Sequence, residues 1–424
     1  MRQGSNESEP TKTRETLYGT QTQLSLRHFG SPRRRIADIP SLIRMYALIK
    51  KAAAAANHSF GVLDTHRAEA IMAACDEVAA GLHSEQFPTA LVLGGGGTTT
   101  NMNMNEVIAS RATQLASMEV HPNDHVNASQ STNDSLPTAM ALTIIEMADE
   151  PLSALRKLAE TLRDKAVEHN ETPYLGRTCL QDAVSVQAGR TLGAQARAVD
   201  RGADGLAGAV RELSAVPIGA TVLGTSIGAP EGFAEVCVKE LAKLVDIDVV
   251  GAQDLYDALA HLDPYAAVAD AATRAAITVA KIASDLRLRA SGPRGGLAEV
   301  TIPALQAGSS IMPAKVNPVV PEYAMQLSYR IRGSAYTVSC AVAAGELELN
   351  VMEPIIIDAL LSIFEDLGRA AATMATLCVA GLEWNGPRRA ENLDQALDRW
   401  VELAGRSGYE AASSSARQEW DHMA

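Results

Sequence analysis

The stretch GSSIMPAKVNPVVPE, residues 308–322, is the part of the sequence on which the interpretation of the fold depends. Gly308 can adopt backbone angles that are closed to other residues, and Pro313 and Pro318 fix theirs. Their spacing predicts an irregular loop rather than a helix or a strand. Lys315 is the one charged residue between the glycine and the second proline, so this loop carries a single cation.

Short polar side chains fill the rest of the loop. Ser309 and Ser310 offer hydroxyls, and a serine hydroxyl becomes a base or a nucleophile only where a cation or backbone N–H groups stabilise its alkoxide. Lys315 and Asn317 are residue types that hold a carboxylate. A lysine-bearing loop that caps a helix would use the same residues without any chemistry, so both interpretations stay open at this point.

A second polar stretch, QSTND at residues 130–134, directly precedes a predicted helix. Ser131, Thr132 and Asn133 could bind a carboxylate, because the N-terminus of a helix adds positive potential. An ordinary N-cap uses the same residue types. Taken alone, this stretch is explained by capping.

Two further stretches are dense in turn-forming residues. Residues 94–103, GGGGTTTNMN, let the backbone approach a small ligand closely, with Thr98 and Thr99 as donors. They lack the G-K-[ST] ending of a P-loop. Residues 121–127, HPNDHVN, contain two histidines and an aspartate, but no third strong ligand follows at a metal-binding spacing. We therefore predict satisfied loop histidines and no metal.

Composition limits the class of protein. Hydrophobic residues make up 47% of the 424 residues, and aromatic residues only 4%, while alanine is abundant. This balance favours a globular chain of closely packed helices. The net charge of −13 argues against nucleic-acid binding, which needs a basic surface. An anionic substrate would need a local cation, because the overall field repels it.

The five cysteines are scattered and form no C-x-x-C pair, which favours a reducing cytoplasm over a disulfide framework or a zinc site. The first residues, MRQGSNESEPTKTRE, have no hydrophobic signal core, and no later apolar run is long enough to span a bilayer. We therefore expect a cytoplasmic protein without a membrane segment.

The pattern of polar and apolar residues predicts three domains. Residues 1–138 combine N-terminal helices with polar stretches. Residues 139–385 place apolar side chains at three- and four-residue steps, as the leucines of 155–162 do, which predicts a bundle of long helices. Residues 386–424 form a short C-terminal domain. We expect helices over 152–166, 182–214, 231–245, 265–290, 320–345 and 353–380, and loops over 172–178, 217–230, 291–302 and 308–318.

Taken together, the polar stretches resemble the signature loops of the fumarase/aspartase superfamily. They occur in the order of that family, at about its spacing, and the match extends from about Tyr18 to about Trp384. The matching segments are NMNMNEV (101–107), HPNDHVN with SQSTND (121–134), GRTCLQDA (176–183), GATVLGT (219–225), GSSIMPAKVNPVVPE (308–322) and ELNVMEP (348–354).

The resemblance implies a mainly α fold with an N-terminal domain, a central bundle of long helices and a small C-terminal domain. It implies a homotetramer with a twenty-helix core, whose active sites combine loops from three subunits. It implies no cofactor. Ala290, Ser291 and Gly292 could cyclise to an electrophilic prosthetic group, but the flanking residues do not resemble those of the enzymes that use one.

The resemblance also implies reversible elimination across a succinyl skeleton, releasing fumarate. Because the C3 proton is not acidic, its removal requires stabilisation of an aci-carboxylate. By motif, Ser309 would be the base and Lys315 would hold a carboxylate. The implied substrate-binding residues are Thr98, Thr99, Asn101, Ser131, Thr132, Asn133, Thr178, Cys179, Ser310 and Asn317, of which Asn133 and Thr178 would face the leaving group.

The leaving group is the least determined part of this interpretation. The loop at 308–322 and LNVMEP are most similar to aspartate ammonia-lyases, which favours elimination of ammonia from L-aspartate. YGTQTQLSLRHF (18–29) leans towards class II fumarases, so hydration of fumarate stays an alternative, as does release of another amine from an N-substituted aspartate. A catalytically silent relative, such as a crystallin-like tetramer, is a third alternative, against which the retained loop residues argue.

Departures from the family pattern include Ser226, which replaces a glycine, and three residues that motivate the alternative leaving groups. Cys179 stands where the family usually has histidine or glutamine, and cysteine is a weak hydrogen-bonding group. A buried apolar thiol would be the structural explanation. Gly228 and Ala298 each stand where aspartases often have asparagine.

Overall fold

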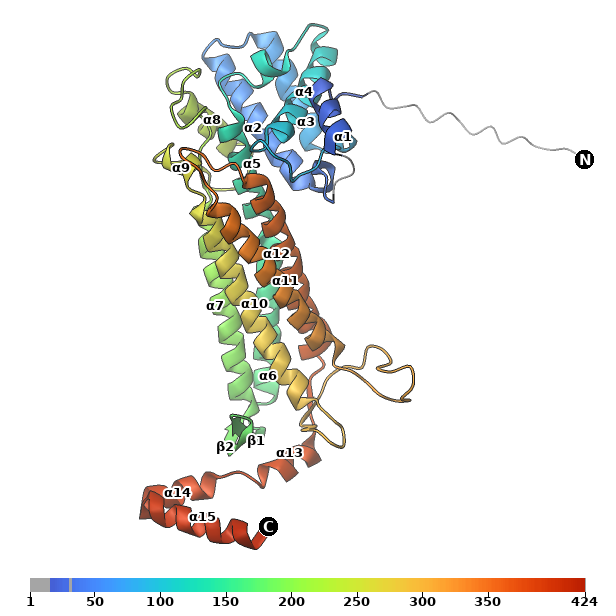
Figure 1. Cartoon of the computed structure of the whole chain (residues 1–424), viewed down its shortest axis with the longest axis vertical. Helices are drawn as coiled ribbons and strands as arrows, with labels where there is room; N and C mark the ends of the chain where they lie inside the picture. Colours follow the sequence, from blue (N-terminus) through green and yellow to red (C-terminus); the bar gives the residue numbers. More distant parts are fainter. Residues whose placement is uncertain (1–15, 30–32, 424) are drawn as a thin grey trace, which may run out of the picture. The chain divides into compact units, whose positions relative to one another are not determined.

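The computed structural model describes residues 16–29 and 33–423 (Figure 1). The first 15 residues, for which we predicted no signal core, lie outside this described part of the chain. Two compact units divide the chain, and each combines three separate stretches of sequence. The first unit comprises Met1–Glu146, Leu213–Leu262 and Ala341–Asp358, and the second comprises Met147–Glu212, Asp263–Cys340 and Ala359–Ala424.

The first unit is mainly helical. Its elements are α1 (Thr20–Phe29), η1 (Ile36–Asp38), α2 (Pro40–Ser59), α3 (Thr65–Ala79), η2 (Ser84–Gln86), α4 (Thr98–Ala116), the π-helical turn η3 (Pro122–Val126), α5 (Thr132–Met147, to residue 146), β3 (Ala215–Val216), α8 (Phe233–Ala242), β4 (Val250–Gly251), α9 (Asp257–Ala260) and the first residues of α12 (Glu353–Thr373).

Helix α2 forms the centre of this unit and packs against α3, α8 and α4. Pro40 occupies its first turn, where a missing N–H costs nothing. The alanines between Ala52 and Ala56 are largely buried, and their small side chains let neighbouring helices come close. The side chain of Asp64 caps α3 by accepting a hydrogen bond from the N–H of Arg67 at 3.0 Å.

The second unit holds the longest helices. Its elements are α6 (Asp149–Glu168), β1 (Pro173–Thr178), β2 (Gln181–Gln187), α7 (Ala188–Glu212), α10 (Asp263–Arg289), β5 (Val300–Thr301), α11 (Val319–Val342, to residue 340), the rest of α12, the π-helical turn η4 (Met374–Val379), β6 (Glu383–Trp384), α13 (Gly386–Leu393), α14 (Asp398–Ser407) and α15 (Tyr409–Met423).

Helices α6, α7, α10, α11 and α12 lie side by side (Figure 1). The buried stripe of α7 follows the helical period and comprises Leu192, Ala196, Val199, Ala203 and Leu206. Gly202 lets α10 approach, since a Cβ there would lie 3.1 Å from the Cα of Ala275. Ion pairs join α10 to α11, from Arg287 to Glu322 at 3.3 Å, and α11 to α12, from Arg330 to Asp366 at 3.2 Å.

The mainly helical fold predicted from the sequence is confirmed, and the predicted long helices lie within a few residues of the observed ones, apart from the start of α7. The prediction was wrong for residues 172–187. We expected a loop followed by a helix from residue 182, but β1 and β2 form an antiparallel hairpin and α7 begins at Ala188. The predicted domain bounds and the tetramer stay predictions.

Within residues 16–29 and 33–423, every helix is too short or too polar to cross a membrane.

Candidate functional site

The first group of predicted site residues opens helix α4. Gly97 precedes the helix with a φ of +77°, and a Cβ there would collide with Leu136, so glycine is required at this point. Thr98 is exposed and its hydroxyl donates to the carbonyl oxygen of Gly95 at 2.8 Å. Thr99 is half-buried. The glycine run therefore ends in a tight turn that presents two threonines at the N-terminus of a helix.

Asn101, one turn further along α4, is buried and fully engaged inside the protein. Its Nδ2 donates to Asn127 Oδ1 at 3.1 Å and to Thr132 Oγ1 at 3.0 Å. Its Oδ1 accepts from the hydroxyl of Tyr46 at 2.9 Å. Both N–H groups of this amide are therefore used inside the protein, which leaves it no donor for a carboxylate. The structure therefore shows Asn101 as a support for Thr132, not as an exposed contact residue.

The second group opens helix α5. The Oγ of Ser131 accepts from the N–H of Asn133 at 3.2 Å, which is the N-cap geometry anticipated for this stretch. Thr132 and Asn133 are half-buried, and their hydroxyl and amide groups donate no hydrogen bond to any described residue. These two side chains at a helix N-terminus are therefore available to an anion.

Asp134 anchors the α5 group to the GATVLGT stretch. Its carboxylate accepts from the N–H groups of Ser131 at 2.9 Å, Gly219 at 3.1 Å and Thr221 at 2.8 Å. Burial raises the pKa of Asp134 to about 6, against the lowering effect of these N–H donors. Sequence inspection missed this residue, because an aspartate in the first turn of a helix looks like an ordinary capping residue.

The 308–318 loop, in the second unit, is closed on itself. The N–H of Gly308 donates to the carbonyl oxygen of Lys315 at 2.8 Å, and Asn317 Nδ2 donates to the carbonyl oxygen of Gly308 at 2.9 Å. A Cβ at residue 308 would lie 2.7 Å from the Lys315 oxygen, so the closure requires glycine. Asn317 thus holds the base of the loop.

Ser309 is the best-supported chemical group of this loop. Its half-buried Oγ accepts hydrogen bonds from the N–H groups of Ile311 at 3.2 Å and Met312 at 3.0 Å. Two N–H donors aimed at one oxygen stabilise negative charge on it. Ser310 and Lys315 are exposed, and the Lys315 ammonium has no ion-pair partner among the described residues. The loop therefore presents a hydroxyl oxygen that accepts two N–H groups and, beside it in sequence, an exposed ammonium.

The third group lies at the β1–β2 hairpin. Thr178 pairs with Gln181, and the two turn residues between them, Cys179 and Leu180, have φ values of +52° and +62°. Such angles suit the tight turns that match the twist of a hairpin. Cys179 is exposed, which rules out the alternative explanation of a buried apolar thiol. The cysteine stands at the tip of the hairpin, where it can face a ligand.

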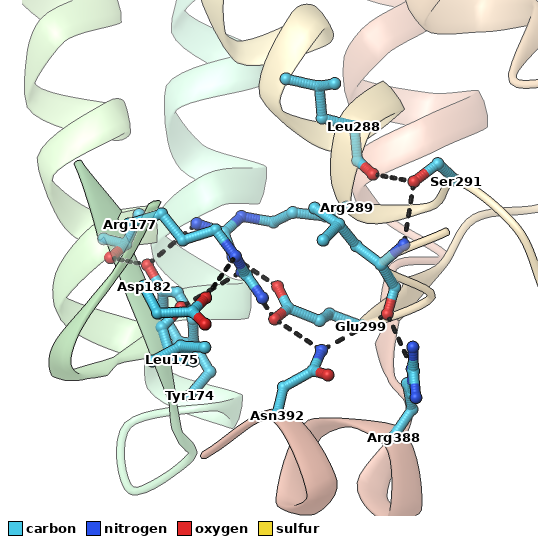
Figure 2. Close-up of polar contacts among 12 residues, drawn as sticks. Tyr174, Leu175, Arg177, Asp182, Leu288, Arg289, Ser291, Glu299, Arg388 and Asn392 are labelled. Carbon is cyan, nitrogen blue, oxygen red and sulfur yellow. Dashed lines mark hydrogen bonds and ion pairs between the residues drawn. The ribbon is translucent and has the colours of Figure 1, made fainter. Parts of the chain in front are cut away.

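A buried carboxylate supports this hairpin (Figure 2). Glu299 has no exposed side-chain surface and accepts from Arg177 Nη1 and Arg289 Nη1, each at 2.8 Å. Asn392 Nδ2, from α13, donates to the same carboxylate at 3.0 Å. Arg177 directly precedes Thr178, so Glu299 connects the hairpin to the end of α10 and to the C-terminal segment.

Aromatic rings complete this support. The guanidinium of Arg289 lies 4.3 Å from the ring centroid of Tyr174 in β1 and 5.9 Å from that of Trp384 in β6. The N-terminus of α14 also contacts the hairpin, since Asp398 accepts from the N–H of Ser185 at 2.9 Å and from its hydroxyl at 2.8 Å. The short C-terminal segment therefore packs on the strands that carry Thr178.

Contacts within this chain assemble the predicted site only in part. The structure joins Asn101 to Thr132 in the first unit, and Asn317 to the loop that carries Ser309 and Lys315 in the second. Among the described residues, no hydrogen bond or ion pair joins that loop to the β1–β2 hairpin.

The histidines of HPNDHVN are engaged as expected. His121 Nδ1 accepts from the N–H groups of Asn123 at 3.3 Å and Asp124 at 3.1 Å, and His125 Nδ1 accepts from the N–H of His121 at 2.8 Å. A different trio, Glu168, His169 and Glu383, has the donor atoms for a metal. Lys165 Nζ already lies 2.9 Å from Glu168 and 3.6 Å from Glu383, so an ammonium pairs with both carboxylates.

Comparison with known proteins identifies the family. The model of a lyase family matches residues 9–333. An aspartate ammonia-lyase from a Bacillus species is 36% identical over 96% of this chain and 88% of its own length. A class II fumarate hydratase from Pseudomonas aeruginosa is 39% identical over 96% of this chain and 89% of its own length.

The fold agrees with these sequence relatives. A solved structure described as fumarate lyase:delta crystallin from Brucella melitensis, bound to cobalt, superposes with a TM-score of 0.92 at 37% identity, over 96% of this chain and 90% of that one. A mainly helical fold with these polar loops defines a lyase of the fumarase/aspartase type. The chain belongs to this lyase family, and the resemblance found in its loops is confirmed.

Proposed function

We propose that this protein eliminates ammonia from L-aspartate to give fumarate, reversibly and without a prosthetic group. The carrying observation is the 308–318 loop, in which two backbone N–H groups point at Ser309 Oγ and the exposed Lys315 has no ion-pair partner in the part of the chain that the structure describes. The aspartate ammonia-lyase relatives support this choice of leaving group.

In this proposal Ser309 removes the C3 proton as its alkoxide, which the N–H groups of Ile311 and Met312 stabilise. Negative charge then builds up on the adjacent carboxylate as the aci form. Lys315 pairs with a substrate carboxylate, and the ammonium group leaves as the C–N bond breaks. The proton taken by Ser309 returns to solvent after fumarate departs.

The remaining predicted residues have assigned places in this proposal. Thr98, Ser131 and Thr132 bind the two carboxylates at the N-termini of α4 and α5, where the helix dipoles favour an anion. Asn133, Thr178 and Cys179 face the leaving group. Thr99 and Ser310 complete the pocket, whereas Asn101 and Asn317 act through the hydrogen bonds described above.

We further propose a homotetramer in which different subunits contribute these loops to one active site. The outward face of α11 supports this arrangement, because Tyr329 and Tyr336 are 57% and 73% exposed two helical turns apart. Gly333 and Cys340 are exposed on the same face, which leaves room for another helix. The free cysteines support a reducing, cytoplasmic location, and the charge of −13 supports a small-molecule partner over nucleic acid.

The direct test supplies purified protein with L-aspartate and follows the ultraviolet absorbance of fumarate. Fumarate formation by the wild-type protein is the expected result. No fumarate from aspartate, combined with turnover of another substrate that Ser309→Ala abolishes, would overturn the assignment.

Hydration of fumarate, or addition of another amine, is the second candidate. The class II fumarase relatives and the exposed Cys179 at the hairpin tip favour it. Incubation of fumarate with water alone, ammonia, hydroxylamine and small primary amines separates the candidates. Selective use of one nucleophile other than ammonia would assign the protein to that reaction, and binding of fumarate without turnover would indicate a catalytically silent relative.

A further inference from the structure

Lys50 is a fully buried lysine in α2, and no pattern in the sequence distinguishes it from its neighbour Lys51. Its Nζ donates to Asn127 Oδ1 at 3.0 Å and lies 5.4 Å from the ring centroid of Tyr46. A buried ammonium is costly unless the surroundings compensate it, so a lysine in this place calls for an explanation. The neighbouring Lys51 forms an ordinary surface ion pair, with its Nζ 2.6 Å from the carboxylate of Asp76, whose side chain is 56% exposed.

The hydrogen-bonding capacity of an ammonium explains what Lys50 does to its neighbour. A charged lysine has three donors and no acceptor, so Asn127 must turn its oxygen, not its NH₂ group, towards Lys50. The Nδ2 of Asn127 donates to the carbonyl oxygen of Gln130 at 3.1 Å, which agrees with this orientation. The same oxygen also accepts from Asn101 Nδ2 and Asn105 Nδ2, each at 3.1 Å.

Asn101 links the oriented Asn127 to Thr132 at the start of α5. Since Asn101 must present its NH₂ group to Asn127, the same nitrogen also donates to Thr132 Oγ1 at 3.0 Å. The hydroxyl of Tyr46 fixes the other end of the amide by donating to Asn101 Oδ1 at 2.9 Å. The oxygen of Thr132 is thereby an acceptor, and its hydroxyl hydrogen has no acceptor among the described residues.

We propose that Lys50 is a positioning residue for dicarboxylate binding: through Asn127 and Asn101 its donor-only ammonium turns the Thr132 hydroxyl outward as a donor to a substrate carboxylate. Its positive charge also favours an anion at the N-terminus of α5. This role rests on the proposed function, because it assigns Thr132 to a carboxylate of the substrate.

Burial lowers the pKa of Lys50 to about 7, with Asp134 acting in the opposite direction. The groups facing it are Tyr46 on α2, Cys75 from α3, Asp134 from α5 and Cys237 from α8. Burial raises the pKa of both thiols above their ordinary range, and that of Asp134 to about 6. Across neutral pH both thiols stay neutral, while Lys50 loses its charge and Asp134, whose pKa lies about one unit lower, completes its ionisation. The contribution of Lys50 is therefore the part of the pH response that a Lys50 substitution removes.

The sign of the pH effect follows. Below pH 7 Lys50 is charged, donates only, and fixes the chain of amides. As pH rises through about 7 it becomes neutral and gains an acceptor, so Lys50 no longer excludes the other orientation of Asn127, which then rests on Gln130, Asn101 and Asn105 alone, and the positive charge is lost. Dicarboxylate affinity should fall over that range.

The test uses succinate, a dicarboxylate without a leaving group, and isothermal titration calorimetry on the full-length protein at about pH 6 and about pH 8.5, on either side of the pKa. Wild-type protein and the control Lys51→Met should bind succinate about tenfold more weakly at the higher pH. Lys50→Met should bind about tenfold more weakly than wild type at the lower pH and show only the smaller further loss that ionisation of Asp134 causes.

Lys50→Gln separates charge from geometry, since glutamine can still donate to Asn127 but carries no charge and has an acceptor. Partial recovery at the lower pH with a weaker pH response than wild type is expected, and melting curves establish that each variant is folded. If Lys50→Met does not fold, Lys50→Gln and the wild-type pH response carry the test.

Two results would overturn the inference. A folded Lys50 variant that keeps both the affinity and the pH response of wild type contradicts the role of Lys50 alone. Absence of both succinate binding and fumarate formation in the wild-type protein contradicts the proposed function, and this inference with it.

Discussion

The α4–α5 region of the first unit and the 308–318 loop of the second are built in opposite ways. In the first, Asn101, Asn127 and Asp134 use buried hydrogen bonds to fix the side chains that face a ligand. The loop is mostly exposed and, apart from its connection to α11, its hydrogen bonds among the described residues run from one loop residue to another.

This difference indicates a division of labour. A buried network with every amide oriented is rigid, which suits the recognition of fixed carboxylates. A self-closed, exposed loop can move as a unit, since few contacts outside it must break, and such loops close over substrates in many enzymes. Substitutions in the two regions should therefore separate effects on activity from effects on stability.

The largest effect is expected for Ser309→Ala in the loop. Loss of a general base should lower kcat by about 10²–10⁴ with little change in melting temperature, because the hydroxyl makes only loop contacts. Initial rates of fumarate formation and thermal melts measure both quantities. Gln306→Ala, an exposed change just before the loop, is the control. Near-normal kcat in Ser309→Ala would assign the base elsewhere.

Glu299→Ala should instead lower the stability of the protein, because Glu299 is a buried carboxylate that holds two arginines. Removing this carboxylate leaves Arg177 and Arg289 without their partner and should lower the free energy of unfolding by about 3–5 kcal/mol.

Urea unfolding at constant m-value provides the measurement, and Glu391→Ala is the matched control. Glu391 pairs with Arg388 at 2.9 Å but is 65% exposed, so its loss should cost at most about 1 kcal/mol. Equal effects of the two substitutions would show that the hairpin does not depend on its buried anchor.

Glu353, at the start of α12, predicts a pH dependence of stability. Burial raises its pKa from 4.5 to about 8, so the stability it contributes is fully present below pH 4.5 and is lost as pH rises to about 8. Glu353→Gln, which stays neutral, should weaken this decline in the urea midpoint between pH 5 and 8. The exposed Glu348→Gln should follow the wild-type curve, and a parallel curve for Glu353→Gln would refute the prediction.

The smallest effect is expected for Cys179→Ala. The thiol is exposed at the hairpin tip and is a weak hydrogen-bonding group, so kcat/KM for aspartate should change by no more than about twofold. Steady-state kinetics with aspartate and ammonia provide the measurement. A loss of tenfold or more would mean that the thiol contributes more to binding of the leaving group than a weak hydrogen-bonding group should.

The long helices could be predicted because apolar side chains recur at three- and four-residue steps within each helix, as the leucines of 155–162 do. Sequence inspection missed the β1–β2 hairpin for an equally local reason. The strand β2 is largely exposed and alternates weakly, and the turn uses Cys179 and Leu180 at positive φ instead of the asparagine and glycine that mark such turns.

By itself, the sequence determined the family and the chemical types in each loop, because the order Ser309, Lys315, Asn317 and the capping residues of α5 are local patterns. Only the tertiary structure decided that Asn101 supports Thr132 and that Lys50 and Glu299 are buried. Burial of a charge depends on which distant helices cover it, here α3 and α8 over α2, and no local pattern records that packing.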